Sequence, residues 1–115
     1  MHAVIFEVIP NEGRKEDYLN IAASLRSELE KMEGFISIER FQSLTNPQKI
    51  LSLSFWKNEE GIKQWRNFEK HRLAQLKGRK YIFKDYHLRI AAVNRDYGMF
   101  DRGEVPADSK SFHHG

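Results

Sequence analysis

The chain has no cysteine among its 115 residues. This absence excludes disulfide bonds, thiolate zinc sites and a cysteine nucleophile, and it leaves the redox compartment undetermined. The sequence also lacks a glycine-rich phosphate loop, a dinucleotide-binding fingerprint and a paired His-x-x-x-His motif. A flavin or nicotinamide enzyme of the usual kind is therefore not expected, and we expect neither a cofactor nor a metal site.

Long apolar runs and a strong charge imbalance are absent as well. No stretch approaches the roughly 18 apolar residues that a membrane span requires, and the N-terminus has no basic lead-in of the kind that opens a secretory signal. The 19 basic and 16 acidic residues leave a net charge of +3, too small to indicate nucleic-acid binding by itself. We expect a cytoplasmic protein that binds neither membranes nor nucleic acid.

The residues that are present predict one packed domain. Apolar residues make up 40% of the chain and aromatic residues 12%, which is above the range of disordered chains. After Gly98 the sequence becomes polar and rich in turn-forming residues. We expect residues 1–98 to form the domain and residues 99–115 to form a loosely held C-terminal tail.

Hydrophobic periodicity predicts six secondary-structure elements. Strands are expected where apolar side chains alternate or run together, over residues 3–9, 35–44, 50–56 and 84–97. Helices are expected where apolar residues recur every three or four positions, over residues 14–32 and 58–77. The order β-α-β-β-α-β is typical of an α+β ferredoxin-like sandwich, in which both helices cover one face of an antiparallel sheet.

Alternation along the strands also predicts which side chains share a face. In the second strand we expect Ile36 and Ile38 on one face and Phe35 and Phe41 on the other. The first and third strands carry apolar side chains on both faces, so the sheet face without helices is expected to be apolar too. Such a surface usually indicates a partner, and a homodimer paired sheet against sheet is the expected solution.

The second helix combines positive charge with aromatic side chains. Residues 57–80 hold eight basic side chains against three acidic ones, together with Trp65, Phe68 and His71. One interpretation is a solvated helix face whose aromatic rings point into the core. The other is a helix that lines a pocket for a planar anionic or phenolic ligand, because Arg donates forked hydrogen bonds to oxyanions and aromatic rings supply stacking area.

His71 is the candidate general base of this helix, since imidazole titrates near neutral pH. The neighbouring cations Lys70, Arg72 and Arg66 would favour the neutral form that accepts a proton. The apolar stripe loses phase near His71, so we expect a bend or break there. The role of His71 depends on an inward-facing imidazole, and a surface or capping role is the alternative.

Trp65 and the Gly78-Arg79 pair each have a structural interpretation beside the functional one. The helical spacing of Trp65 is typical of a core residue. Gly78 fits a C-terminal helix cap, and Arg79 fits a cation placed near the negative end of the helix dipole. These residues therefore indicate a functional region without defining its chemistry.

Several segments in this order resemble the antibiotic biosynthesis monooxygenase domain. They are the strand Leu51-Ser-Leu-Ser-Phe-Trp56, the segment Asn58-Glu-Glu-Gly-Ile-Lys-Gln-Trp65, His71, Gly78-Arg79 and the final Arg89-Ile-Ala-x-Val-x-Arg95-Asp-Tyr97. The resemblance covers about residues 1–97. It implies a dimeric α+β barrel built from two ferredoxin-like subunits, with a pocket in each subunit between sheet and helices.

The family includes cofactor-independent oxygenases of polyketide phenols, quinol oxygenases and haem-degrading enzymes. The polyketide oxygenases place a tyrosine six positions after the pocket tryptophan and an asparagine one turn before it, whereas Trp65 is followed by His71 and preceded by Gly61. The haem-degrading members place an asparagine in the first strand and a histidine further along the helix. Haem degradation is therefore not expected, and the polyketide role stays open.

The resemblance implies a cofactor-independent monooxygenase that uses O2 on a small aromatic, phenol-like or quinol-like compound. In this hypothesis His71 removes a phenolic proton, Arg79 or Arg66 stabilises the oxyanion, and the electron-rich ring reacts directly with O2. The walls of its dry pocket are the aromatic side chains of Trp65, Phe55 and Phe68. The alternatives are a non-enzymatic small-molecule-binding or stress-response dimer of the same fold, and an oligomeric module that acts through protein contacts.

Overall fold

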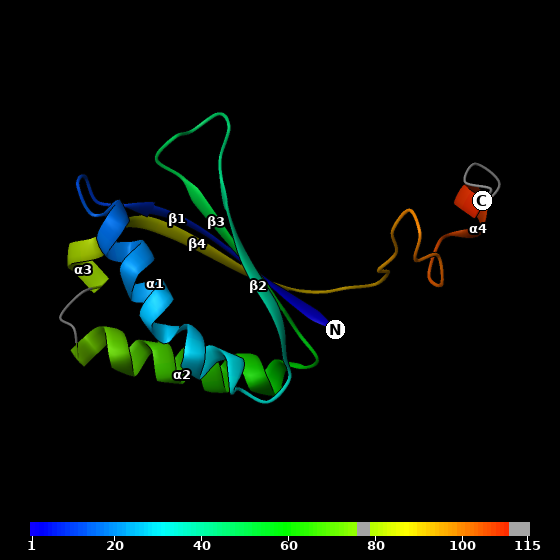
Figure 1. The fold of residues 1–115 in the computed structure, drawn as a ribbon, viewed down its shortest axis with the longest axis horizontal. Coiled ribbons are helices and arrows are strands. Elements are labelled where there is room, and N and C mark those ends of the chain that lie inside the picture. Colours follow the sequence, from blue (N-terminus) through cyan, green and yellow to red (C-terminus); the bar gives the residue numbers. More distant parts are fainter. Residues whose placement is uncertain (76–78, 111–115) are drawn as a thin grey trace.

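The computed structural model describes residues 1–75 and 79–110 and shows the expected α+β architecture (Figure 1). Its elements in chain order are β1 (His2–Pro10), α1 (Lys15–Glu30), β2 (Phe35–Gln42), β3 (Ile50–Trp56), α2 (Glu59–Gln75), α3 (Arg79–Ile82), β4 (Phe83–Ala92) and α4 (Ala107–Lys110). The four-residue helices α3 and α4 were not expected, and β4 ends earlier than the sequence indicated. No helix in the described ranges is long and apolar enough to cross a membrane.

The four strands form one antiparallel sheet in the order β2-β3-β1-β4, and α1, α2 and α3 lie on the same side of it (Figure 1). We call the helix-covered side the inner face and the opposite side the outer face. Two rows of aligned residues cross the inner face from β2 to β4, namely Ile38, Ser54, Val4, Ile90 and Arg40, Ser52, Phe6, Leu88. The outer face carries Ile5, Leu51, Leu53 and Phe55 among its residues.

Trp56 at the end of β3 joins the helices to the sheet. Its side chain is 1% exposed and packs with Leu29 of α1 and Ile62 of α2. The indole Nε1 donates a hydrogen bond to Ser54 Oγ at 2.9 Å, so the polar atom of this large buried ring is satisfied. A second cluster around Val8 and the buried ring of Tyr18 fixes the other end of α1.

A bulge in β2 makes the expected facing of Phe35 and Ile36 wrong, whereas Ile38 and Phe41 lie on opposite faces as expected. The register shifts between Phe35 and Ser37, so Ile36 has no aligned partner on β3. Phe35 and Ile38 consequently both pack against the Trp56 cluster, while Ile36 is 45% exposed. One extra residue in a strand reverses the alternation on one side of it, which is why simple period-2 counting failed here.

The first turn of α2 packs closely against Glu33 and Trp56. Asn58 Oδ1 accepts a hydrogen bond from the Gly61 backbone N–H at 3.2 Å, which satisfies one of the free donors of the first helical turn. Gly61 is buried beside the Glu33 carbonyl and the Trp56 ring. From there α2 continues without interruption through His71 to Gln75, so the break expected near His71 is not observed.

Residues 93–110 leave the sheet and extend away from the body (Figure 1). This segment has hydrogen bonds of its own, from Arg102 Nη1 to the Gly98 carbonyl at 3.1 Å and from Arg95 Nη1 to the Glu104 carbonyl at 3.1 Å. Val105 is buried. The part of the tail that the structure describes is thus organised locally, and the boundary at residue 98 stays a prediction.

Gly61→Ala should destabilise the protein although alanine is the better helix former by about 1 kcal/mol. An added Cβ would collide with the Glu33 carbonyl oxygen and lie 3.0 Å from Trp56 Cε3. Overpacking of this kind costs about 1–3 kcal/mol, so urea unfolding should show a lower free energy of unfolding. Gly98→Ala is the control, because no atom lies within 4 Å of a Cβ there. A Gly61→Ala protein as stable as the wild type would contradict this packing.

Candidate functional site

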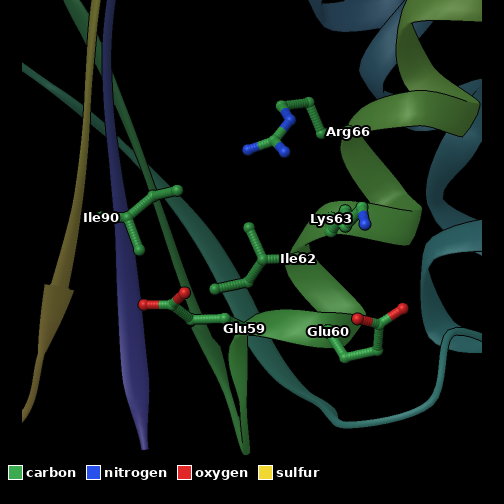
Figure 2. Close-up of a pocket in the computed structure, with 6 residues that line it drawn as sticks. All are labelled: Glu59, Glu60, Ile62, Lys63, Arg66 and Ile90. Atoms are coloured by element: carbon green, nitrogen blue, oxygen red, sulfur yellow. The ribbon is translucent and has the colours of Figure 1, made fainter.

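A groove lies between the first half of α2 and the edge strand β4 (Figure 2). We call it the α2–β4 groove, and it is lined by Glu59, Glu60, Ile62, Lys63, Arg66 and Ile90. Its volume is about 190 Å³, below the roughly 300–1,000 Å³ of sites for drug-sized ligands. The groove of one chain is therefore small on the scale of such sites.

The groove exists because α2 leaves the β4 edge of the sheet partly uncovered. Trp56 and Leu29 hold Ile62 against the body, so α2 is fixed to the sheet at its first two turns. On β4, Leu88 and Ile90 belong to the inner face yet remain 43% and 39% exposed. Exposed apolar side chains beside a groove can contact an apolar ligand.

Arg66 is the polar side chain that distinguishes this groove. Figure 2 shows its guanidinium extending from α2 toward the strands, while Ile62 and Ile90 face each other across the groove. Within the described part of the chain, Arg66 makes no hydrogen bond or ion pair. Glu59 also points toward the strands, and its Oε1 lies 3.6 Å from His2 Nε2. A guanidinium with available donors beside an apolar floor suits a ligand with one anionic or phenolic oxygen.

A second polar group lies on the inward side of the same helix, and we call it the Glu69 cluster (Tyr18, Arg40, Trp65 and Glu69). Arg40 Nε of β2 donates to Tyr18 Oη of α1 at 3.4 Å. The Trp65 side chain donates a hydrogen bond to the Glu69 carboxylate. Trp65 also stacks on Phe68, with ring centroids 5.6 Å apart. The cluster therefore brings a carboxyl, a guanidinium, a phenol and an indole together from three elements.

Burial dominates the electrostatics of this cluster. It raises the pKa of the Glu69 carboxyl, against the opposing influence of Arg40 and of the hydrogen bond from Trp65. It likewise raises the pKa of the Tyr18 phenol, and Arg40 again opposes the change. A carboxyl whose charged form is disfavoured by burial despite a nearby cation is a candidate for proton transfer. The described residues contain no group of three side chains that could hold a metal ion.

Two of the sequence-predicted site residues lie elsewhere. His71 is exposed and lies six residues after Trp65, which places it about 120° away around the helix axis. The inward orientation on which its role depended is therefore absent. Phe55 alternates with Ser54 and Trp56, whose side chains are on the inner face, so Phe55 lies on the outer face and cannot wall a pocket beneath the helices.

The remaining predicted residues are partly brought together. Trp65 and Phe68 are half-buried neighbours on α2, and Arg66 lines the groove. Gly78 and the side chain of Arg79 lie outside the described residues. Sequence reasoning missed Glu69, although a signal was present, since Glu69 follows Ile62 and Trp65 at the helical spacing of the apolar stripe.

Comparison with known proteins connects this geometry to a family. The sequence model described as antibiotic biosynthesis monooxygenase matches residues 1–76. The chain is 48% identical over 93 residues to a Pyricularia oryzae protein named jasmonate monooxygenase ABM, a match that covers 81% of this chain and 43% of that protein. The chain thus spans less than half of the length of this relative.

Solved structures with low sequence identity share the fold. The haem-degrading protein MhuD of Mycobacterium tuberculosis superposes with a TM-score of 0.63 at 16% identity, covering 85% of this chain and 100% of that one. SnoaB, a cofactor-independent oxygenase of Streptomyces nogalater, gives a TM-score of 0.66 at 8% identity, covering 83% and 94%. At these identities the likeness concerns the fold alone.

The raised pKa of Glu69 predicts how stability changes with pH. The folded chain binds this proton more tightly than the unfolded chain, so the contribution of the carboxyl is most favourable at low pH and is lost as pH rises through the folded-state pKa. Glu69→Gln lacks this titration. The unfolding free energy of the wild type minus that of Glu69→Gln should therefore fall as the pH rises above about 4, where an unfolded glutamate titrates, in urea titrations.

The control for this comparison is Glu12→Gln, which removes an exposed carboxylate in the turn after β1. A wild-type advantage over Glu69→Gln that grows as the pH rises would show that the partners of Glu69 outweigh its burial.

Proposed function

Because the chain belongs to the antibiotic biosynthesis monooxygenase family, we propose that it is a cofactor-independent monooxygenase. Its substrate in this proposal is a small aromatic, phenol-like or quinol-like compound bound in the α2–β4 groove. The observation that carries the proposal is the Arg66 guanidinium, which extends beside the apolar pair Ile62 and Ile90 (Figure 2). This combination suits a compact apolar ring that carries one oxygen able to become an oxyanion.

The chain's own residues would promote the reaction by electrostatics and exclusion of water. Arg66 donates forked hydrogen bonds to the substrate oxygen and so lowers the cost of its negative charge. Ile62 and Ile90 hold the ring and keep water from it. A deprotonated, electron-rich ring can then donate electrons to O2 directly, so that the substrate itself supplies the reducing power.

The same groove supports a second substrate class. The relative named jasmonate monooxygenase is 48% identical to this chain, and a jasmonate-type substrate carries a carboxylate that Arg66 could bind with the same two donors. The groove volume of about 190 Å³ argues against haem, whose macrocycle exceeds the space that one chain provides. The competing proposal is a non-enzymatic dimer that binds such compounds without turnover.

We propose further that two chains pair through their outer faces. Ile5, Leu51, Leu53 and Phe55 are only half-buried on that side, and α1 to α3 all lie on the other side of the sheet (Figure 1). An apolar patch on a sheet face that α1, α2 and α3 leave uncovered is well matched to a second copy of itself.

Oxygen uptake with a panel of hydroquinones and anthrones tests the enzymatic proposal. With an accepted substrate, Arg66→Gln should raise KM roughly 10-fold or more, because a hydrogen bond to a charged group contributes about 1.5–3 kcal/mol. Arg26→Gln removes an exposed arginine of α1 that pairs with Glu30 and should leave KM unchanged. Saturable binding without oxygen uptake would favour the non-enzymatic module instead.

Light scattering after gel filtration tests the pairing. The wild type should elute with about twice the 13.6 kDa mass of one chain. Leu53→Glu, which places a charge on the outer face, should shift the protein toward the mass of one chain because an unpaired charge is costly in an apolar interface. Ser27→Glu on the exposed surface of α1 is the control. A wild type that elutes at 13.6 kDa would exclude the dimer.

A further inference from the structure

Oxygenation of this kind is promoted by a group that takes a proton from the substrate, and His71 lies five residues beyond Arg66, about 140° away around the axis of α2, and is not among the groove-lining residues. The groove itself is lined by the cations Lys63 and Arg66 and by Glu59 and Glu60 in the exposed first turn of α2. Glu69 is a carboxyl of the described part of the chain whose pKa is raised by burial. Whether its carboxyl can reach a ligand in the groove depends on its position on α2.

Glu69 is not among the groove-lining residues, but it lies on the neighbouring part of the α2 surface. It follows Arg66 by three residues and Ile62 by seven, which are spacings that stack side chains along one face of a helix. One helical turn advances about 5.4 Å along the axis, so Glu69 lies about one turn beyond the guanidinium. The side chain is half-buried, so its carboxyl is neither sealed in the core nor fully solvated.

The described partners of Glu69 come from three elements. On α2 the Trp65 indole donates a hydrogen bond to the carboxylate, from β2 Arg40 contributes a positive charge, and from α1 the Tyr18 phenol interacts with the same carboxyl. A carboxylate has about four lone-pair sites, so the bond from Trp65 leaves acceptor capacity for a substrate proton. Trp65 and Arg40 thus orient the group without saturating it.

We propose that Glu69 takes the substrate proton in the α2–β4 groove and returns it to the reduced oxygen, with Arg40 and Trp65 as positioning residues. This inference rests on the proposed monooxygenase function. Arg66 anchors the substrate oxygen, and the carbon to be oxygenated lies one helical turn farther along α2, under Glu69. The balance between burial, Arg40 and Trp65 moves the pKa of this carboxyl upward, in the direction that suits a general base working near neutral pH.

The reaction of an anthrone illustrates the balance of atoms and electrons. Glu69 accepts a proton from the ring CH2, and the electron pair stays on the carbon, which transfers electrons to O2 and forms a C–O bond. The Glu69 proton then neutralises the peroxide. Loss of the second C–H proton with cleavage of the O–O bond leaves a ketone and water. The substrate carbon supplies all four electrons, so no external reductant is needed.

The test compares wild type, Glu69→Gln and Glu69→Asp in the oxidation of anthrone to anthraquinone, followed by oxygen uptake and absorbance. Glu69→Gln should lower kcat by roughly 10²–10⁴-fold, the usual contribution of a general base, with little change in KM because Arg66 is intact. The acidic limb of the wild-type kcat–pH profile should disappear in Glu69→Gln and persist in Glu69→Asp, which keeps a carboxyl group. Glu12→Gln serves as the matched control for loss of a carboxylate.

The outcomes separate this inference from the function on which it rests. Binding of anthraquinone to Glu69→Gln with the wild-type Kd shows that the variant is folded with an intact groove. If this variant does not bind anthraquinone, the pH profile of Glu69→Asp tests the role of Glu69 instead. A wild type that oxidises anthrone while Glu69→Gln keeps its kcat and acidic limb would overturn the role of Glu69 alone. A wild type that oxidises neither anthrones nor hydroquinones would overturn the monooxygenase proposal, and the role of Glu69 with it.

Discussion

The packing of Trp56 against the start of α2 determines where everything else in this molecule lies. The indole fills the space between sheet and helices, and its polar atom is satisfied within its own strand by Ser54. Gly61 allows α2 to approach the ring and the Glu33 carbonyl more closely than any residue with a Cβ could. This contact fixes the start of α2 on the inner face, where Ile90 at the β4 edge remains partly exposed.

The inner face is unusual because polar residues interrupt its apolar surface. Ser52 and Ser54 are buried in the middle of β3, and Arg40 faces the helices from β2. Glu69 adds a carboxyl from α2 whose pKa is raised by burial. Buried polar groups cost free energy unless they are hydrogen-bonded, and apolar side chains would pack here more favourably. Their presence is explained if this part of the interior serves chemistry as well as folding.

The sequence was sufficient for the order of the elements, because the apolar repeats of α1 and α2 and the alternation of β3 are long and regular. It was insufficient wherever one residue changed the phase. The bulge at Ile36 reversed one side of β2, and such a bulge has no reliable signature in a run of apolar residues. The choice of His71 followed from its chemistry rather than its position, whereas α2 is continuous through it. The sequence shows Glu69 as a charged residue on the apolar stripe of α2. Its electrostatic partners Arg40 and Tyr18 are distant in the sequence, so only the structure identifies them.

The central claim is that the α2–β4 groove is where this family member binds its substrate. A crystal structure of the protein soaked with anthraquinone, as an unreactive product, tests it most directly. The account predicts the ring between Ile62 and Ile90, with a carbonyl oxygen within hydrogen-bond distance of the Arg66 guanidinium and the opposite edge of the ring toward Glu69. Anthraquinone bound beside His71 or on the outer face, with the groove empty, would contradict it.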